Sequence, residues 1–170
     1  PNADFRKDAF GITLDYYSGD YLSRGHTVSA PPYPSETQDQ FNSLIKGTYW
    51  HDPVDGNKSF AYGYQYDPRY QFKDARWGVQ EISGWTFNTT LKPYMESIIG
   101  YSAGGNALDG YDANGNILYL NRHNRLGASV ANFKYNYTTN TNRLDNITLN
   151  GTADVFRQYN YNKIGQMTIQ

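Results

Sequence analysis

A glycine-flanked serine gives the chain its strongest resemblance to an enzyme. Residues 100–104, GYSAG, match the G-x-S-x-G signature of a hydrolase nucleophile elbow, in which Ser102 would attack the substrate. An acid and then a histidine must follow, and Asp109, Asp112 and His123 occur in that order. The signature also requires a helix directly after the serine, whereas the next stretch is rich in glycine and turn residues. A turn between β-hairpins is therefore the favoured interpretation, and a serine hydrolase is kept as an alternative.

The segment that follows Ser102 also has oxygen-bearing side chains at alternate positions, as in a calcium-binding loop. Asp112, Asn114 and Asn116 have the spacing of ligands in such a loop. Gly115 comes one position too early, however, and no glutamate follows to supply the distal bidentate carboxylate. We therefore expect a hairpin turn here, with no bound metal and no other cofactor.

Composition excludes several further kinds of chemistry. The chain has no cysteine, which rules out disulfides, thiolate metal sites and cysteine nucleophiles. A formal net charge of -1 without a basic stripe offers no surface for nucleic acid. No apolar run reaches the length of a transmembrane helix, so direct membrane insertion is not expected. The three histidines are scattered along the chain and predict no metal site.

The elements that must position these residues are predicted to be β-strands. The 170 residues include 17 tyrosines and 16 glycines, a composition typical of short strands joined by turns. Residues 59–67, SFAYGYQYD, form the clearest strand, because aromatic residues alternate with small or polar ones at period two. Helical periodicity is convincing nowhere. We expect an all-β fold of antiparallel β-hairpins that form a curved sheet.

A repeat runs through these hairpins. Each unit is a strand ending in Tyr-x-Tyr, a polar turn, and an apolar residue that starts the next strand, and Tyr111, Tyr137 and Tyr161 are separated by 26 and 24 residues. Stacked hairpins of this kind bury a face that one hairpin alone cannot bury. Asn114-Gly115 predicts a two-residue type I′ turn, and Asp112 is expected to bond to turn amides. The predicted repeat core consists of Tyr64, Tyr66, Tyr111, Asp112, Asn114, Gly115, Asn116, Tyr135, Tyr137, Tyr159 and Tyr161.

The YDANGNIL stretch at 111–118, with the neighbouring Tyr-Asn-Tyr and Asn-Arg-Leu stretches, resembles the Rhs (rearrangement hotspot) or YD-repeat family. FGITLDYYSGDY, YGYQYDPRYQF, LKPYMESI and GYDANGNILYLNR follow one another as in Rhs proteins of the Bacteroidota, so the resemblance covers nearly the whole chain. It implies a β-sheet strip that spirals into a hollow shell, or cocoon. In related proteins the shell encloses a toxic C-terminal domain or forms part of a large cell-surface or exported protein.

On this resemblance, residues 1–170 are expected to be an Rhs/YD-repeat segment of a longer chain. Within it we expect a strand and turn at 1–21, a proline-rich loop at 22–40, hairpins at 41–99 and YD-repeat units at 100–170. The resemblance implies a secreted or cell-surface bacterial protein exported by the type IX route. Its expected partners are the remainder of its own chain, an effector domain inside the shell and proteins of the secretion machinery.

Three further hypotheses concern particular residues. Some Rhs proteins cut themselves at an aspartate-proline site, but Asp52-Pro53 and Asp67-Pro68 lack the family's following Gly-Leu and are interpreted as turns. A surface adhesin or glycan-binding module is the main alternative function, with Trp50 as a possible sugar-stacking residue. The expected role is structural rather than enzymatic, so no catalytic residue is assigned.

Overall fold

The computed structural model describes residues 11–20, 31–52, 58–82, 84–88, 90–101, 107–150 and 152–169. These residues form strands, turns and loops and include no helix, which confirms the expected all-β, mostly antiparallel fold. In this part of the chain no helix is long and apolar enough to cross a membrane. The chain divides into two compact units, Pro1–Gln65 with Ala75–Lys92, and Tyr66–Asp74 with Pro93–Gln170. Each unit is described by itself.

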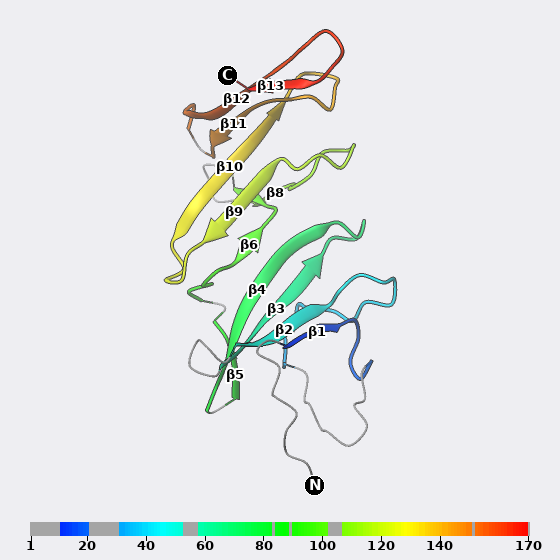
Figure 1. The fold of residues 1–170 in the computed structure, drawn as a ribbon, viewed down its shortest axis with the longest axis vertical. Helices are drawn as coiled ribbons and strands as arrows, with labels where there is room; N and C mark the ends of the chain where they lie inside the picture. The colour runs from blue at the N-terminus through cyan, green and yellow to red at the C-terminus, as the bar shows by residue number, and fades with distance from the viewer. Residues whose placement is uncertain are drawn as a thin grey trace, which may run out of the picture. The chain divides into compact units, whose positions relative to one another are not determined.

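Unit 1 is built on a meander of antiparallel strands (Figure 1). Strand β1 pairs with β2, β2 with β3, and the short β5 with the end of β4. The loop at residues 31–46 contains no strand, whereas the preceding residues 21–30 lie outside the described part. The strands of this meander are β1 (Gly11–Asp15), β2 (Gly47–Asp52), β3 (Lys58–Tyr66), β4 (Phe72–Glu81) and β5 (Gly84–Phe87). The last residue of β3, Tyr66, and the first three residues of β4 belong to unit 2.

The two faces of β3 are covered differently. Its small and polar residues Ala61, Gly63 and Gln65 are buried, and the alternating aromatic residues are only half-buried. Gly63 and Gly47 lie against the ring of Tyr33, and a Cβ atom at Gly47 would overlap that ring. Because the backbone approaches the tyrosine so closely, the loop rather than the aromatic side chains covers the buried face of this sheet.

The half-buried face of unit 1 carries a row of stacked aromatic rings. Trp50 stacks on Tyr62 at a centroid distance of 5.9 Å, and Phe60 stacks on Trp77 at the same distance. Tyr62 in turn stacks on Tyr64 at 6.3 Å. Each ring of the row therefore packs on neighbouring rings, an arrangement that contributes about 0.5–1.5 kcal/mol per pair beyond burial.

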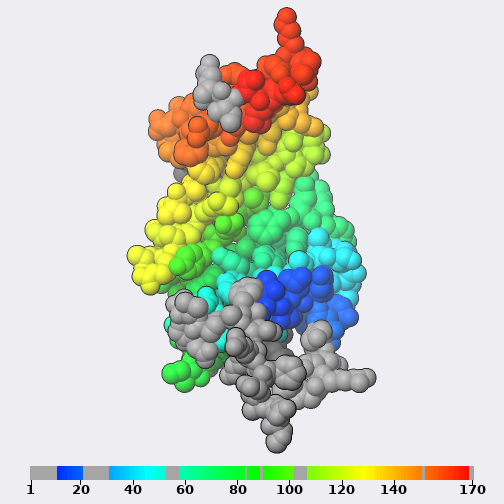
Figure 2. Space-filling view, viewed as in Figure 1, coloured from blue at the N-terminus to red at the C-terminus, as the bar shows by residue number. Residues whose placement is uncertain are grey.

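Unit 2 contains a sheet in which strands adjacent in sequence are also neighbours in space, as Figure 1 shows for β9 to β13. The order is β6-β9-β10-β11-β12-β13, with every pairing antiparallel, and β7 pairs separately with β8. In the space-filling view these strands form successive bands from green to red (Figure 2). The strands are β6 (Glu96–Ser97), β7 (Gly100–Tyr101), β8 (Ala107–Leu108), β9 (Tyr119–His123), β10 (Ser129–Tyr137), β11 (Leu144–Leu149), β12 (Val155–Tyr161) and β13 (Met167–Ile169).

Opposite faces of this sheet have opposite chemistry. Tyr135 pairs with Ile147 on one face, and the neighbouring pair Asn136 and Asn146 lies on the other. The Asn136 amide donates to the Asn146 side-chain oxygen at 2.8 Å. Successive residues of a strand point to opposite faces, so the register separates an apolar, tyrosine-bearing face from an amide-bearing one. Of the described side chains here, only a few apolar ones, among them Ile147, are buried.

The turn after Tyr111 differs from the prediction. Only Gly115 has a positive φ, 83°, and Asn114 does not, so the expected type I′ turn is wrong. The Gly115 N–H donates to the Asp112 carbonyl at 3.1 Å, and the Asp112 N–H donates to the Asn116 carbonyl at 3.0 Å. This is a type I turn followed by a left-handed glycine, the usual three-residue hairpin loop. A type I′ turn would require positive φ at both central residues, whereas in this loop only Gly115 has positive φ.

The carboxylate of Asp112 closes this loop as predicted. Its Oδ1 accepts the backbone N–H groups of Asn114 at 2.9 Å and Asn116 at 2.8 Å. Asp67 makes the equivalent bonds to Arg69 and Gln71, both at 2.8 Å, so Asp67-Pro68 is a turn as expected. These bonds satisfy turn amides that the strand ladder leaves unpaired.

Substitutions at equivalent positions in two of these loops should affect the free energy of unfolding differently. Gly115 has φ 83° and Tyr70 has φ 63° at the same loop position. Gly115→Ala should lower the free energy of unfolding by about 1 kcal/mol, because an L-residue is strained in this conformation. Tyr70→Gly should cause no loss, since it relieves that strain at a side chain that is 66% exposed. Denaturant unfolding of both variants checks this, and equal losses at both positions would contradict it.

Candidate functional site

The feature that recurs most regularly in unit 2 is a hydrogen bond from a tyrosine hydroxyl to a backbone carbonyl. The Tyr111 hydroxyl donates to the carbonyl of Phe72 at 2.7 Å. The Tyr137 hydroxyl donates to Ile117 at 2.9 Å, and the Tyr161 hydroxyl to Leu144 at 3.1 Å. Each donor is the last tyrosine of its own hairpin, and each acceptor belongs to the hairpin before it. We call these three bonds the tyrosine locks.

The acceptors are equivalent residues of successive hairpins. Tyr111 faces Ile117 across its own hairpin, and Tyr137 faces Leu144. Asp112 and Asn116 form the hydrogen-bonded pair next to Tyr111 and Ile117. Pairs alternate along an antiparallel ladder, so the Ile117 carbonyl points out of its own hairpin and toward the next one. Each hairpin can therefore accept one lock and donate another.

Side chains of the loops reinforce the contact between successive hairpins. The amide groups of Asn114 and Asn116 both donate to the side-chain oxygen of Asn142, at 3.1 and 2.9 Å. The guanidinium group of Arg143 lies 5.4 Å from the centroid of the Tyr161 ring. Successive hairpins are thus joined by hydrogen bonds between side-chain amides and by a cation–π contact, as well as by the locks.

Burial raises the pKa of two donor hydroxyls, those of Tyr111 and Tyr137. Desolvation raises the pKa of Tyr111, and the nearby Asp67 carboxylate raises it further. The pKa of Tyr137 is raised by desolvation first and then by Asp112 and neighbouring tyrosines. A neutral phenol is the form that donates a hydrogen bond, so both shifts extend the pH range of the lock on the alkaline side.

The other tyrosines of the predicted repeat core have different neighbours. Tyr135 and Tyr159 are half-buried on the same strands as Tyr137 and Tyr161. Tyr66 ends the strand that leads to the first acceptor hairpin, and its ring lies 6.4 Å from that of Phe72. In unit 1, Tyr64 instead shares a hydrogen bond of 3.0 Å with the Thr48 hydroxyl. The remaining predicted residues, Asp112, Asn114, Gly115 and Asn116, form the loop described above.

Sequence reasoning missed a further copy of this loop. At Asn124, the side-chain Oδ1 accepts the N–H groups of Leu126 at 2.9 Å and Ala128 at 3.0 Å, and Gly127 has φ 78°. Asn162 closes its loop in the same way. The shared signal is an Asp or Asn followed three residues later by glycine, which residues 124–127 carry without a preceding tyrosine.

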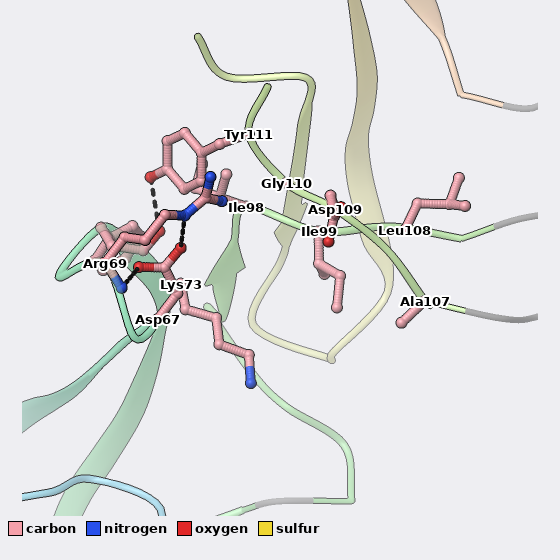
Figure 3. Close-up of a pocket in the computed structure, with 11 residues that line it drawn as sticks. Asp67, Arg69, Lys73, Ile98, Ile99, Ala107, Leu108, Asp109, Gly110 and Tyr111 are labelled. Carbon is pink, nitrogen blue, oxygen red and sulfur yellow. Dashed lines mark hydrogen bonds and ion pairs between the residues drawn. The ribbon is translucent and has the colours of Figure 1, made fainter. Parts of the chain in front are cut away.

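The first lock lies in an open hollow of about 270 Å³ (Figure 3). Phe72, Ile98 and Tyr111 contribute to its lining, and charged side chains such as Lys73 surround it. Gly110 is required there, because a Cβ atom on it would collide with the backbone oxygen of Ile98. Beside the hollow, the backbone at Gly110 passes close to the backbone at Ile98.

Of the candidate hydrolase residues, the structure describes Asp109, Asp112 and His123. Ser102 lies outside the described residues. Asp112 is engaged by the amides of its own loop, and hydrogen bonds from Asn116, from Asn114 and from Gly115 hold its pKa below the usual value. The described residues also hold no group of three or more His, Asp or Glu side chains that could bind a metal ion.

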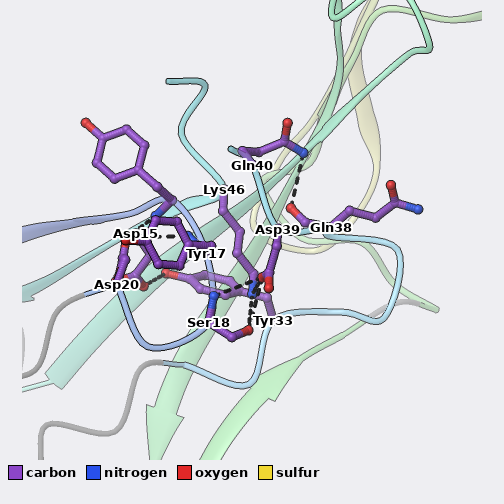
Figure 4. A network of polar contacts seen from close by, with 10 residues as sticks. Asp15, Tyr17, Ser18, Asp20, Tyr33, Gln38, Asp39, Gln40 and Lys46 are labelled. Atoms are coloured by element: carbon purple, nitrogen blue, oxygen red, sulfur yellow. Dashed lines mark hydrogen bonds and ion pairs between the residues drawn. The ribbon is translucent and has the colours of Figure 1, made fainter. Parts of the chain in front are cut away.

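A second polar cluster lies in unit 1, where β1 meets the loop at residues 31–46 (Figure 4). The Tyr33 hydroxyl donates to the buried Asp15 carboxylate at 2.6 Å. Lys46 donates to Asp39 at 2.6 Å, and the same Asp39 oxygen accepts from Ser18 at 3.0 Å. Lys46 also donates to the Ser18 hydroxyl at 3.1 Å, and together these bonds tie the loop to β1 and the turn that follows it.

The fold and the locks define a class of protein: antiparallel β units in which successive hairpins are joined by hydrogen bonds from a tyrosine hydroxyl to a backbone carbonyl. Comparison of the chain with models of protein families, with curated proteins and with solved structures finds no match.

Removing one lock should cost stability, whereas removing a neighbouring hydroxyl should not. Tyr137→Phe deletes the bond to the Ile117 carbonyl and should lower the free energy of unfolding by about 1 kcal/mol. Tyr135→Phe is the matched control on the same strand and should change it by less than about 0.5 kcal/mol. Denaturant unfolding monitored by tyrosine fluorescence measures both values. Equal effects of the two substitutions would mean that the lock contributes nothing specific.

The carboxyl group of Asp15 should titrate above its ordinary value. Burial raises its pKa above 3.8, and the Tyr33 hydrogen bond opposes this shift. Because the folded-state pKa is raised, the stability contribution is complete below 3.8 and is lost as the pH rises through the raised pKa. Tyr33→Phe should raise the pKa of Asp15 further.

Carbon-detected NMR titration of the Asp15 carboxyl group measures this shift. Asp39 is the internal control, because its pKa is lowered chiefly by the hydrogen bond from Lys46. It should titrate alike in the wild type and in Tyr33→Phe. An Asp15 pKa that falls in the variant would show that the hydroxyl does not stabilise the carboxylate.

Proposed function

We propose that the chain is a structural segment of a large exported protein of the Rhs/YD-repeat type. Its hairpins form part of the wall of a hollow β-shell, which encloses or presents a C-terminal effector or toxin. The observation that carries this proposal is the recurrence of the tyrosine lock at Tyr111, Tyr137 and Tyr161. The hairpins Tyr111–Ile117 and Tyr137–Leu144 each donate one lock and accept another, so the arrangement can extend by repetition, as a wall requires.

The chemistry of the unit 2 sheet supports a wall as well. One face carries aromatic and aliphatic residues such as Phe133 and Phe156, whose ring centroids lie 4.7 Å apart. The opposite face carries the Asn136–Asn146 amide pair. A single-layer sheet with one apolar and one polar face suits a boundary between two environments.

The partners of such a segment follow from the resemblance. They are the remainder of its own longer chain, an effector domain inside the shell and proteins of the type IX secretion machinery. The location is secreted or at the bacterial cell surface. No catalytic residue, cofactor or nucleic-acid partner is assigned.

The glycan-binding alternative is less well supported by the aromatic residues of unit 1. Sugar rings stack on an open aromatic face, whereas Trp50 lies between Phe60 at 5.7 Å and Tyr62 at 5.9 Å. Rings that pack on one another in this way offer edges rather than faces to a saccharide.

Electron cryo-microscopy of the complete natural protein tests the proposal. We expect residues 107–169 to form consecutive rungs of a wall that surrounds an enclosed space. A map in which these hairpins enclose nothing would contradict it. Labelling of Ser102 by a fluorophosphonate probe, lost in Ser102→Ala, would support the hydrolase alternative instead.

A further inference from the structure

The tyrosine locks leave one equivalent acceptor without a donor in the described structure. Phe72, Ile117 and Leu144 each follow a hairpin loop and each accept a tyrosine hydroxyl from the next hairpin. Met167 is the fourth residue of this series, because it pairs with Tyr161 as Leu144 pairs with Tyr137.

The hydrogen-bond pattern fixes the direction of the Met167 backbone groups. The Asn162 N–H donates to the Gln166 carbonyl at 3.0 Å, so these residues form a hydrogen-bonded pair. The next pair, Tyr161 and Met167, is therefore of the non-hydrogen-bonded type. In such a pair the N–H and C=O groups point away from the partner strand, so those of Met167 face the free side of β13.

The free side of β13 is a sheet edge. In the described part of the chain, β13 pairs with β12 alone and ends the strand order of unit 2. An edge with outward backbone groups accepts a further strand readily. Met167 is 50% exposed.

We infer that the β13 edge is a binding site for an extended strand that ends in a tyrosine directly before a hairpin loop. This tyrosine donates its hydroxyl to the Met167 carbonyl, and the backbone of its strand extends the sheet in antiparallel register. The three existing locks argue for this occupant, because each donor is the residue directly before a hairpin loop and each joins the same acceptor position. The inference rests on the proposed function and adds to it the chemistry that selects the next partner.

A fluorescein-labelled peptide that copies residues 155–169 is a suitable probe, since it contains the Tyr-Asn-Tyr-Asn strand and its loop. Fluorescence anisotropy with the whole 170-residue chain should show saturable binding. Replacing the second tyrosine of the peptide by phenylalanine should weaken binding about fivefold, the equivalent of one neutral hydrogen bond. Replacing the first tyrosine should leave the affinity unchanged.

Variants of the protein locate the site. Met167→Pro removes an outward N–H without removing a β12–β13 bond, and it should abolish binding. Met167→Val retains the N–H and should bind as the wild type does. Amide NMR signals of β12 should be the same in both variants, which shows that the hairpin stays folded.

Several outcomes would overturn the inference. These are absence of saturable binding, equal affinity of the two phenylalanine peptides, or binding that survives Met167→Pro. A concentration-dependent dimer that Met167→Pro dissolves and that excludes the peptide would assign the edge to a second copy. The proposed shell is judged separately by electron cryo-microscopy, so a failed peptide test leaves that result unaffected.

Discussion

The hydrogen bond between a tyrosine hydroxyl and the carbonyl of the preceding hairpin is the interaction on which unit 2 depends. The sheet has few buried apolar side chains in its described part, so a packed core does not fix the alignment of its strands. Each lock contributes only about 0.5–1.5 kcal/mol net. Its larger effect is on register, because a slip of one residue would turn the tyrosine to the opposite face.

Closure of the loops is local and independent of the locks. Asp67, Asp112, Asn124 and Asn162 each accept two backbone N–H groups of their own loop. The loop that begins at Thr138, where the other loops have Asp or Asn, is closed by a different hydrogen bond. This loop is one residue longer, and the Thr141 hydroxyl accepts from the Arg143 N–H at 3.1 Å. Hairpin formation and hairpin stacking are thus encoded by separate residues, which allows either to vary along a repeat.

The sequence was sufficient to predict most of the longer strands and the role of the turn residues, but it did not reveal how the faces are covered. Period-two alternation in β3 separates Tyr62 and Tyr64 from Ala61 and Gly63, yet says nothing of which set is buried. The answer depends on Tyr33, which is distant in sequence and packs against Gly63. The acceptors of the locks are backbone atoms, which leave no residue-type signal. The turn type was wrong because an Asn-Gly pair is compatible with both a type I′ turn and a left-handed glycine after type I.

One bond within the Asp112 loop has a consequence for the chemical lifetime of the protein. An Asn-Gly sequence is prone to deamidation, in which the glycine backbone nitrogen attacks the asparagine side chain and forms a cyclic imide. Here the Gly115 N–H is bonded to the Asp112 carbonyl, and the Asn114 amide is held by Asn142. Both hydrogen bonds must break before this ring can close. The folded loop is therefore expected to slow deamidation at Asn114.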